Sequence, residues 1–116
     1  MSPQDFVQLV QRTRFRLTDE KSVQEALSKA LSERGIPHER EVTLGPGDIV
    51  DFMLPDGLAV EIKIKASRRA IYRQCERYCR SEKVSALVLA TATATGFPPE
   101  LAGKPCWVAS LGTGCL

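Results

Sequence analysis

Two carboxylates and a lysine stand close together near the middle of the sequence, at Asp51, Glu61 and Lys63. Between the carboxylates, Pro55-Asp56-Gly57 predicts a tight turn, because proline presets the second turn position and glycine accepts a positive φ. A three-residue loop centred on Asp56 places Asp51 directly opposite Glu61 on the neighbouring strand. Because alternate strand residues share a face, Glu61 and Lys63 lie on the same side as Asp51.

This arrangement predicts metal-assisted hydrolysis of a phosphodiester. Two carboxylates directly opposite each other repel, and a divalent cation offsets that repulsion. Magnesium, or manganese in its place, takes carboxylate oxygens together with phosphate and water. A lysine two residues further on can orient the attacking water and neutralise charge on the phosphate. The simpler alternative is that Lys63 forms an ion pair with a surface carboxylate.

Asp48 is the alternative to Asp51. A two-residue loop of Asp56 and Gly57 would shift the pairing by one residue and bring Asp48 to the same face as Glu61. Pro55 fits the second position of the longer turn, so the sequence favours Asp51.

The rest of the sequence predicts a mixed α/β fold with a central sheet covered by helices on both sides. Ser2 and Pro3 begin a first helix, and a basic connector covers Arg12–Arg16. Thr18 is the expected N-cap of a second helix that ends near Arg34, before Gly35. The expected later elements are strands at His38–Leu44, Asp48–Leu54 and Leu58–Lys65, a helix at Arg68–Ser81 capped by Ser67, a buried strand at Val84–Ala92 and a short strand at Cys106–Leu111.

Basic side chains concentrate on and just before the later helix, which suits a polyanionic ligand. The candidate nucleic-acid contacts are Lys65, Arg68, Arg69, Arg73 and Arg77, with Arg80 on the same outer ridge. Alternatively, these arginines pair with Glu76 and Glu82 on a solvated face.

The same residues resemble a known family. Asp51 is followed by nine residues and then Glu61-Ile62-Lys63, within GDIVDFMLPDGLAVEIKIK, and Gln74 and Tyr78 follow within RQCERY. This pattern resembles the PD-(D/E)XK nuclease superfamily, in its RecB-like and Holliday-resolvase-like branch, over residues 18–92. Val50 stands where the strict form of the motif has proline.

The resemblance implies a restriction-endonuclease-like core with the order αβββαβ. It also implies metal ligation by Asp51, Glu61 and the Ile62 carbonyl, catalysis by Lys63 and support from Gln74. A further acid is expected on the preceding helix. Glu20 is favoured because it points with that helix's apolar face. The alternative is Glu25, which points nearly opposite and fits a capping box with Ser22.

The length of 116 residues predicts one domain, with residues 1–17 forming a helix and connector and residues 18–111 the core. No apolar run reaches the length of a membrane helix, and no secretory signal is visible, so we expect a cytoplasmic protein without a membrane partner. The four cysteines match no zinc spacing and are expected to pack in the core.

The leading hypothesis is therefore a Mg²⁺-dependent nuclease that acts on DNA rather than RNA. A core without a specificity domain favours structure-selective or nicking endonuclease activity, by the chain alone or as a homodimer. Such stand-alone cores resemble those encoded by phages and mobile elements. The alternatives are a catalytically silent nucleic-acid-binding or assembly module with the same fold, and a cysteine-based redox or cluster protein.

Overall fold

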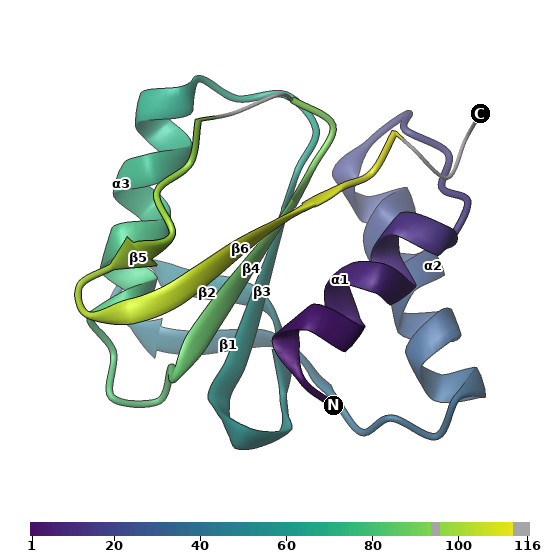
Figure 1. The fold of residues 1–116 in the computed structure, drawn as a ribbon, viewed down its shortest axis with the longest axis horizontal. Coiled ribbons are helices and arrows are strands. Elements are labelled where there is room, and N and C mark those ends of the chain that lie inside the picture. Colours follow the sequence, from purple (N-terminus) through teal and green to yellow (C-terminus); the bar gives the residue numbers. More distant parts are fainter. Residues whose placement is uncertain (94–95, 113–116) are drawn as a thin grey trace.

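In the part of the chain that the structure describes, a mixed six-stranded sheet forms the centre and three helices cover it (Figure 1). The computed structural model describes residues 1–93 and 96–112. Its elements are α1 (Pro3–Arg12), α2 (Glu20–Glu33), β1 (Glu39–Gly45), β2 (Asp48–Leu54), a 3-10 turn (Pro55–Gly57), β3 (Leu58–Lys63), α3 (Arg68–Cys79), β4 (Ala86–Thr91), β5 (Glu100–Leu101) and β6 (Lys104–Ser110).

The strands lie in the order β1-β2-β3-β4-β6-β5. The pairs β3/β4 and β4/β6 are parallel, whereas β1/β2, β2/β3 and β5/β6 are antiparallel. Every residue of β4 is buried, as a central parallel strand covered on both faces requires. The expected mixed sheet is confirmed.

Helices α1 and α2 cover one face of the sheet and α3 covers the other (Figure 1). On the first face, Phe6 and Leu27 pack against Val60 and Ile62 of β3. On the second face, Ile71 and other apolar residues of α3 pack against the sheet. Each helix turns one apolar face to the sheet, and the buried residues are Phe6, Leu9 and Val10 in α1, Val23, Leu27, Ala30 and Leu31 in α2, and Ile71, Cys75, Tyr78 and Cys79 in α3.

The start of α2 differs from the prediction. Asp19, not Thr18, is the N-cap, and its Oδ1 accepts from the Ser22 N–H at 2.7 Å. Aspartate accepts such a bond well, and its negative charge suits the positive helix N-terminus. The capping box proposed for Ser22 and Glu25 is therefore wrong, and Glu25 instead forms an ion pair with Arg40 at 3.1 Å.

The predicted three-residue loop is confirmed. The backbone pairs Leu54 with Leu58 and Phe52 with Val60, which is the register that directs Asp51 toward Glu61. Asp56 takes a positive φ of 65° and Gly57 one of 76°. A Cβ at Gly57 would lie 2.9 Å from the Lys83 carbonyl oxygen, so glycine is required there for space as well as for backbone conformation.

The strand β5, a two-residue edge strand, was not predicted, and β6 begins at Lys104 rather than at Cys106. A strand this short carries no periodic signal, and its partner begins with a lysine and a proline rather than with apolar residues.

Candidate functional site

Asp51 lies where β2 leaves β3. Backbone pairing of the two strands continues as far as Phe52 and Val60, one step before Asp51 would pair with Glu61. Phe52 packs with the cluster under α1 and α2, whereas Val50 packs with the cluster under α3. Residues two apart on a regular strand share a face. The chain therefore changes face at Asp51.

The neighbouring strand β1 makes the same change at the same level. Arg40 lies over the Phe52 ring, 5.5 Å from its centroid, while Val42 packs against the cluster under α3. Between them Glu41 has a positive φ of 52°. The β1–β2 pair thus turns as a unit and opens space beside β3.

The two carboxylates occupy that space and replace the missing ladder bonds. The Asp51 N–H donates to Glu61 Oε1 at 3.2 Å, and the Ile62 N–H donates to Asp51 Oδ2 at 2.8 Å. Each carboxylate therefore holds the backbone of the opposite strand. These charge-assisted bonds fix both side chains and satisfy two N–H groups that would otherwise be unpaired in the interior.

Lys63 and Glu20 complete the charged group. Lys63 Nζ lies 3.3 Å from Glu61 Oε2, with 20% of the lysine side chain exposed and 3% of the glutamate side chain. Glu20, the first residue of α2, accepts from the Ile64 N–H at 3.1 Å. The structure thus brings Glu20, rather than Glu25, to the end of β3.

The surroundings of Asp51 and Glu61 disfavour the charged forms of the two carboxylates. Burial and then the Asp51 charge raise the pKa of Glu61 to about 8, against the opposing effects of Lys63 and the Asp51 N–H. Burial raises the pKa of Asp51 too, and the Glu20 charge adds to that rise. Two acids that interact in this way retain a proton near neutral pH unless a cation joins them.

The oxygen donors suit a hard cation that keeps part of its coordination open. Among residues 1–93 and 96–112, no three His, Cys, Asp or Glu side chains form a ready metal-binding group. Asp51 and Glu61 nevertheless supply two adjacent carboxylates, which is the usual protein share of a magnesium site that water and phosphate complete.

A hollow of about 250 Å³ lies beside this group. Its lining includes Glu20, Ile64 and Lys65, together with the connector that leads into α2. Lys65 is exposed at its rim. The hollow gives solvent access next to the carbonyl end of β3.

Gln74 lies on α3 next to the buried Cys75 and is half-buried. Tyr78 is fully buried, and its hydroxyl donates to the Ile49 carbonyl at 2.8 Å. Burial raises the pKa of this hydroxyl, so it stays protonated as a donor. Tyr78 therefore holds the start of β2 against α3 and positions the strand that carries Asp51.

The arginines of α3 fall into two groups. Arg68, Arg69 and Arg73 are exposed. Arg77 Nε instead pairs with Asp48 Oδ1 at 2.9 Å, and Arg80 pairs with Glu76 at 3.2 Å. Asp48, the rejected alternative to Asp51, is thus bound at the surface. The arginines in the N-terminal half of the predicted ridge are therefore exposed to a phosphate ligand. Those in its C-terminal half, Arg77 and Arg80, already pair with acidic side chains.

Three cysteines of the described residues, Cys75, Cys79 and Cys106, are buried and free, as expected for packing residues. Cys79 Sγ and Cys106 Sγ lie 3.8 Å apart between α3 and β6. Cys115 lies outside the described residues.

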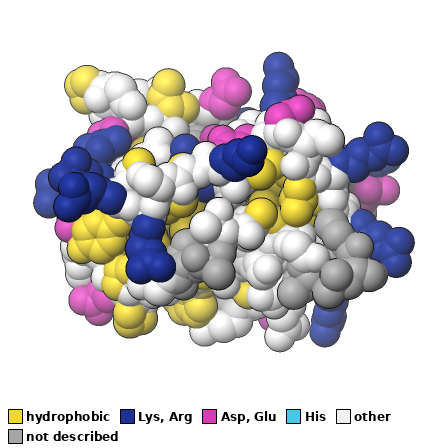
Figure 2. All heavy atoms as spheres, turned by 90° about the horizontal axis from the view of Figure 1, so that it is seen from above, with side chains coloured by type: hydrophobic (Ala, Val, Ile, Leu, Met, Phe, Trp, Pro, Cys, Tyr) yellow, Lys and Arg dark blue, Asp and Glu magenta, His cyan; other side chains and the backbone are white. Residues whose placement is uncertain are grey.

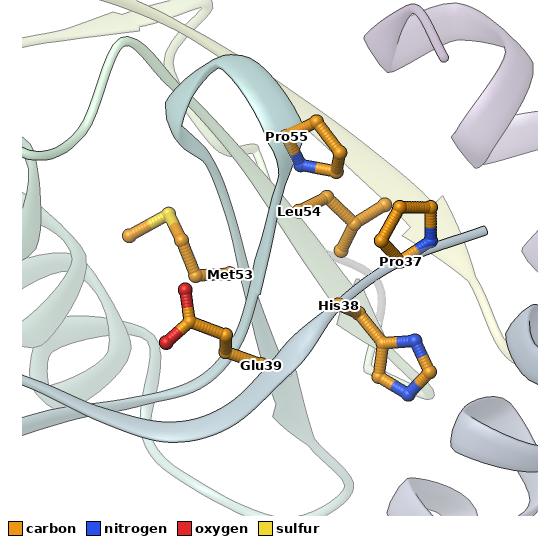
Figure 3. Close-up of a pocket in the computed structure, with 6 residues that line it drawn as sticks. All are labelled: Pro37, His38, Glu39, Met53, Leu54 and Pro55. Atoms are coloured by element: carbon orange, nitrogen blue, oxygen red, sulfur yellow. The ribbon is translucent and has the colours of Figure 1, made fainter.

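A contact that sequence reasoning missed joins α2 to the start of β1. His38 Nε2 lies 2.8 Å from Ser28 Oγ, and His38 Nδ1 lies 3.0 Å from the Ile36 carbonyl oxygen. His38 also borders a hollow of about 200 Å³ lined by Glu39 and Met53 among others, and its ring points away from both (Figure 3). The ring therefore fastens β1 to α2. Two residues ten apart on different elements give no periodic signal in the sequence.

Comparisons of the chain with protein-family models, with curated proteins and with solved structures found no match. The described residues contain no helix of the length and apolarity needed to cross a membrane.

Proposed function

We propose that this chain is a metal-dependent nuclease that hydrolyses DNA phosphodiester bonds. The observation that carries the proposal is the meeting of Asp51 and Glu61 between β2 and β3, with Lys63 Nζ 3.3 Å from Glu61. Two fixed carboxylates and an adjacent ammonium group can hold a cation and a phosphate next to each other.

Asp51, Glu61 and the Ile62 carbonyl would hold Mg²⁺ or Mn²⁺, with Glu20 as the further acid. Such an ion would polarise a phosphoryl oxygen and lower the pKa of bound water. The cross-strand hydrogen bonds to Asp51 and Glu61 set the positions of the ligand oxygens before substrate arrives.

Lys63 has the role of orienting the attacking water and of stabilising negative charge on the phosphate. In the reaction, the water oxygen forms a bond to phosphorus, the bond from phosphorus to the leaving oxygen breaks, and the leaving oxygen takes up a proton. Gln74, half-buried on α3, would support the site.

Membership of the PD-(D/E)XK superfamily, with its restriction-endonuclease-like core, is part of this proposal. It is supported by the Asp51 hairpin, by Glu61 and Lys63 on a strand that pairs with a buried parallel strand, and by the helix with Gln74 and Tyr78 that packs on the same side. The form of activity that we propose is structure-selective or nicking, by a monomer or a homodimer.

The test is a gel assay of the purified protein on supercoiled, linear, single-stranded and branched DNA with Mg²⁺, Mn²⁺ or EDTA. We expect metal-dependent cleavage of at least one substrate and none with EDTA. Cleavage that persists in EDTA would contradict the proposed site. A protein that binds these DNAs but cuts none of them with either metal would instead be the silent nucleic-acid-binding module.

A further inference from the structure

The outer face of α3 carries a shallow groove next to the candidate site. Its volume is about 560 Å³, and it is lined by Arg68, Arg69, Tyr72, Arg73 and Glu76. The helix begins five residues after the end of β3, so its first turn lies at the same end of the sheet as the last residue of β3, Lys63 (Figure 1). The groove therefore leads away from the candidate site along α3.

Tyr72 is an exposed aromatic residue in the middle of this groove. It is 39% exposed and is one of three large hydrophobic residues exposed among the described residues. The ring stacking and cation–π contacts of the described residues involve His38, Phe52 and Arg40, and not Tyr72. The exposed part of its side chain is therefore available to a partner from outside the chain.

The charge of the groove is positive. Arg68, Arg69 and Arg73 are absent from the ion pairs of the described residues. The one acid of the groove, Glu76, is paired with Arg80 at 3.2 Å. Figure 2, seen from the end of the sheet where β3 finishes, shows a group of Lys and Arg atoms with hydrophobic atoms beside them on the side that α3 occupies, and further Lys and Arg atoms on the opposite side.

An unpaired stretch of DNA has the chemistry that fits both features. Its bases expose flat faces that stack on aromatic side chains, and its phosphates pair with arginine. A duplex offers phosphates of the same charge, but its base faces are covered by their neighbours. Arg69 and Arg73, four residues apart, are about 6 Å apart along the helix axis and line the groove together with Tyr72.

We propose that this groove binds single-stranded DNA, with one unpaired base stacked on Tyr72 and phosphates on Arg69 and Arg73. The inference rests on the proposed function in taking DNA as the ligand. It adds the substrate class, which is DNA with an unpaired segment next to the cleaved bond.

The test is fluorescence anisotropy in EDTA, with a fluorescein-labelled oligothymidylate and a duplex of equal length. Tyr72→Ala should weaken single-strand binding roughly 5- to 150-fold, since stacking of one base is worth about 1–3 kcal/mol. Tyr72→Phe, which keeps the ring, should bind as the wild type does. Neither change should alter duplex binding.

Arginine variants test the charge. Arg73→Ala should weaken both ligands and make the salt dependence shallower by about 0.7 for single strands and about 0.9 for duplex. Lys29→Ala, which removes one exposed positive charge from α2 on the opposite face, is the matched control and should change neither. Wild-type affinity of Tyr72→Ala for single strands, an equal loss for duplex, or a Tyr72-dependent dimer without DNA binding would overturn the inference.

These outcomes are separate from the fate of the proposed function. Tyr72-dependent binding without cleavage in either Mg²⁺ or Mn²⁺ would keep the binding inference and refute the nuclease. Cleavage by the wild type, together with unchanged single-strand binding by Tyr72→Ala, would support the nuclease and refute the binding inference.

Discussion

At the scale of single residues, Asp51 and Glu61 act both as acids and as hydrogen-bond acceptors for the opposite strand. The repulsion between the two carboxylates, taken alone, predicts that removing either one slightly stabilises the metal-free protein. The structure adds an opposing effect, because an alanine at either position leaves a backbone N–H without its acceptor. Isosteric amides are therefore the better test.

Asp51→Asn, Glu61→Gln and Lys63→Met should each reduce cleavage by at least about 100-fold, because each removes a charge that positions the ion or the phosphate. The measurement is the initial cleavage rate on the best substrate, with circular dichroism to verify the fold. Asp48→Asn is the matched control. Its ion pair with Arg77 is partly exposed and worth at most about 1 kcal/mol, so it should cut normally. If Asp48→Asn abolished cleavage and Asp51→Asn did not, Asp48 rather than Asp51 would be the carboxylate of the site.

The raised pKa of Glu61 predicts how stability depends on pH in EDTA. The folded protein holds a proton on Glu61 up to a pH of about 8, whereas the unfolded chain releases it near 4.5. Between these values the folded state binds more protons, so its stability falls as pH rises and is largest near the acidic end. Raising the pH from 5 to 8 should lower the melting temperature of the wild type more than that of Glu61→Gln. Equal slopes would mean that Glu61 is ionised throughout this range.

At the scale of elements, the hairpin register could be predicted from one tripeptide, because Pro55 fits the second position of the longer turn and so favours it over the two-residue loop. The change of face at Asp51 could not. It depends on the positive φ of Glu41 in a different strand and on packing against two helical layers, neither of which leaves a mark in the alternation of apolar residues. The Asp19 cap was missed for a local reason, since Thr18 and Asp19 are both good caps and adjacent.

The cap of α2 should matter for the site as well as for stability, because it fixes the first residue of the helix, Glu20. Asp19→Ala should lower the melting temperature by roughly 4 °C, as the loss of a helix cap does in a domain of this size. Thr18→Ala should have little effect. Thermal unfolding of both variants measures the difference, and a larger loss in Thr18→Ala would restore the helix start predicted from the sequence.

At the scale of the whole molecule, a net charge of +2 conceals a separation of charge. Three carboxylates gather at the end of β3 and three exposed arginines lie on the adjoining half of α3. The composition could not predict this, since the separation depends on which arginines are neutralised by Asp48 and Glu76. A cation at the carboxylates would add to the positive field that the arginines already present to a polyanion.

Metal binding should therefore appear as a pH-dependent gain in global stability. An ion that binds only the folded state adds RT ln(1 + [L]/Kd), about 2.7 kcal/mol at 100 times Kd. The carboxylates must lose their shared proton to bind it, so the gain should be larger at pH 8 than at pH 5. Mn²⁺ should raise the melting temperature of the wild type at pH 8 and leave that of an Asp51→Asn/Glu61→Gln double variant unchanged. Asp48→Asn should respond as the wild type does.

Differential scanning fluorimetry with a manganese titration at both pH values measures these shifts. Equal shifts in the wild type and the double variant would place the metal away from the β2–β3 carboxylates, and a shift independent of pH would mean that no proton is displaced when the ion binds.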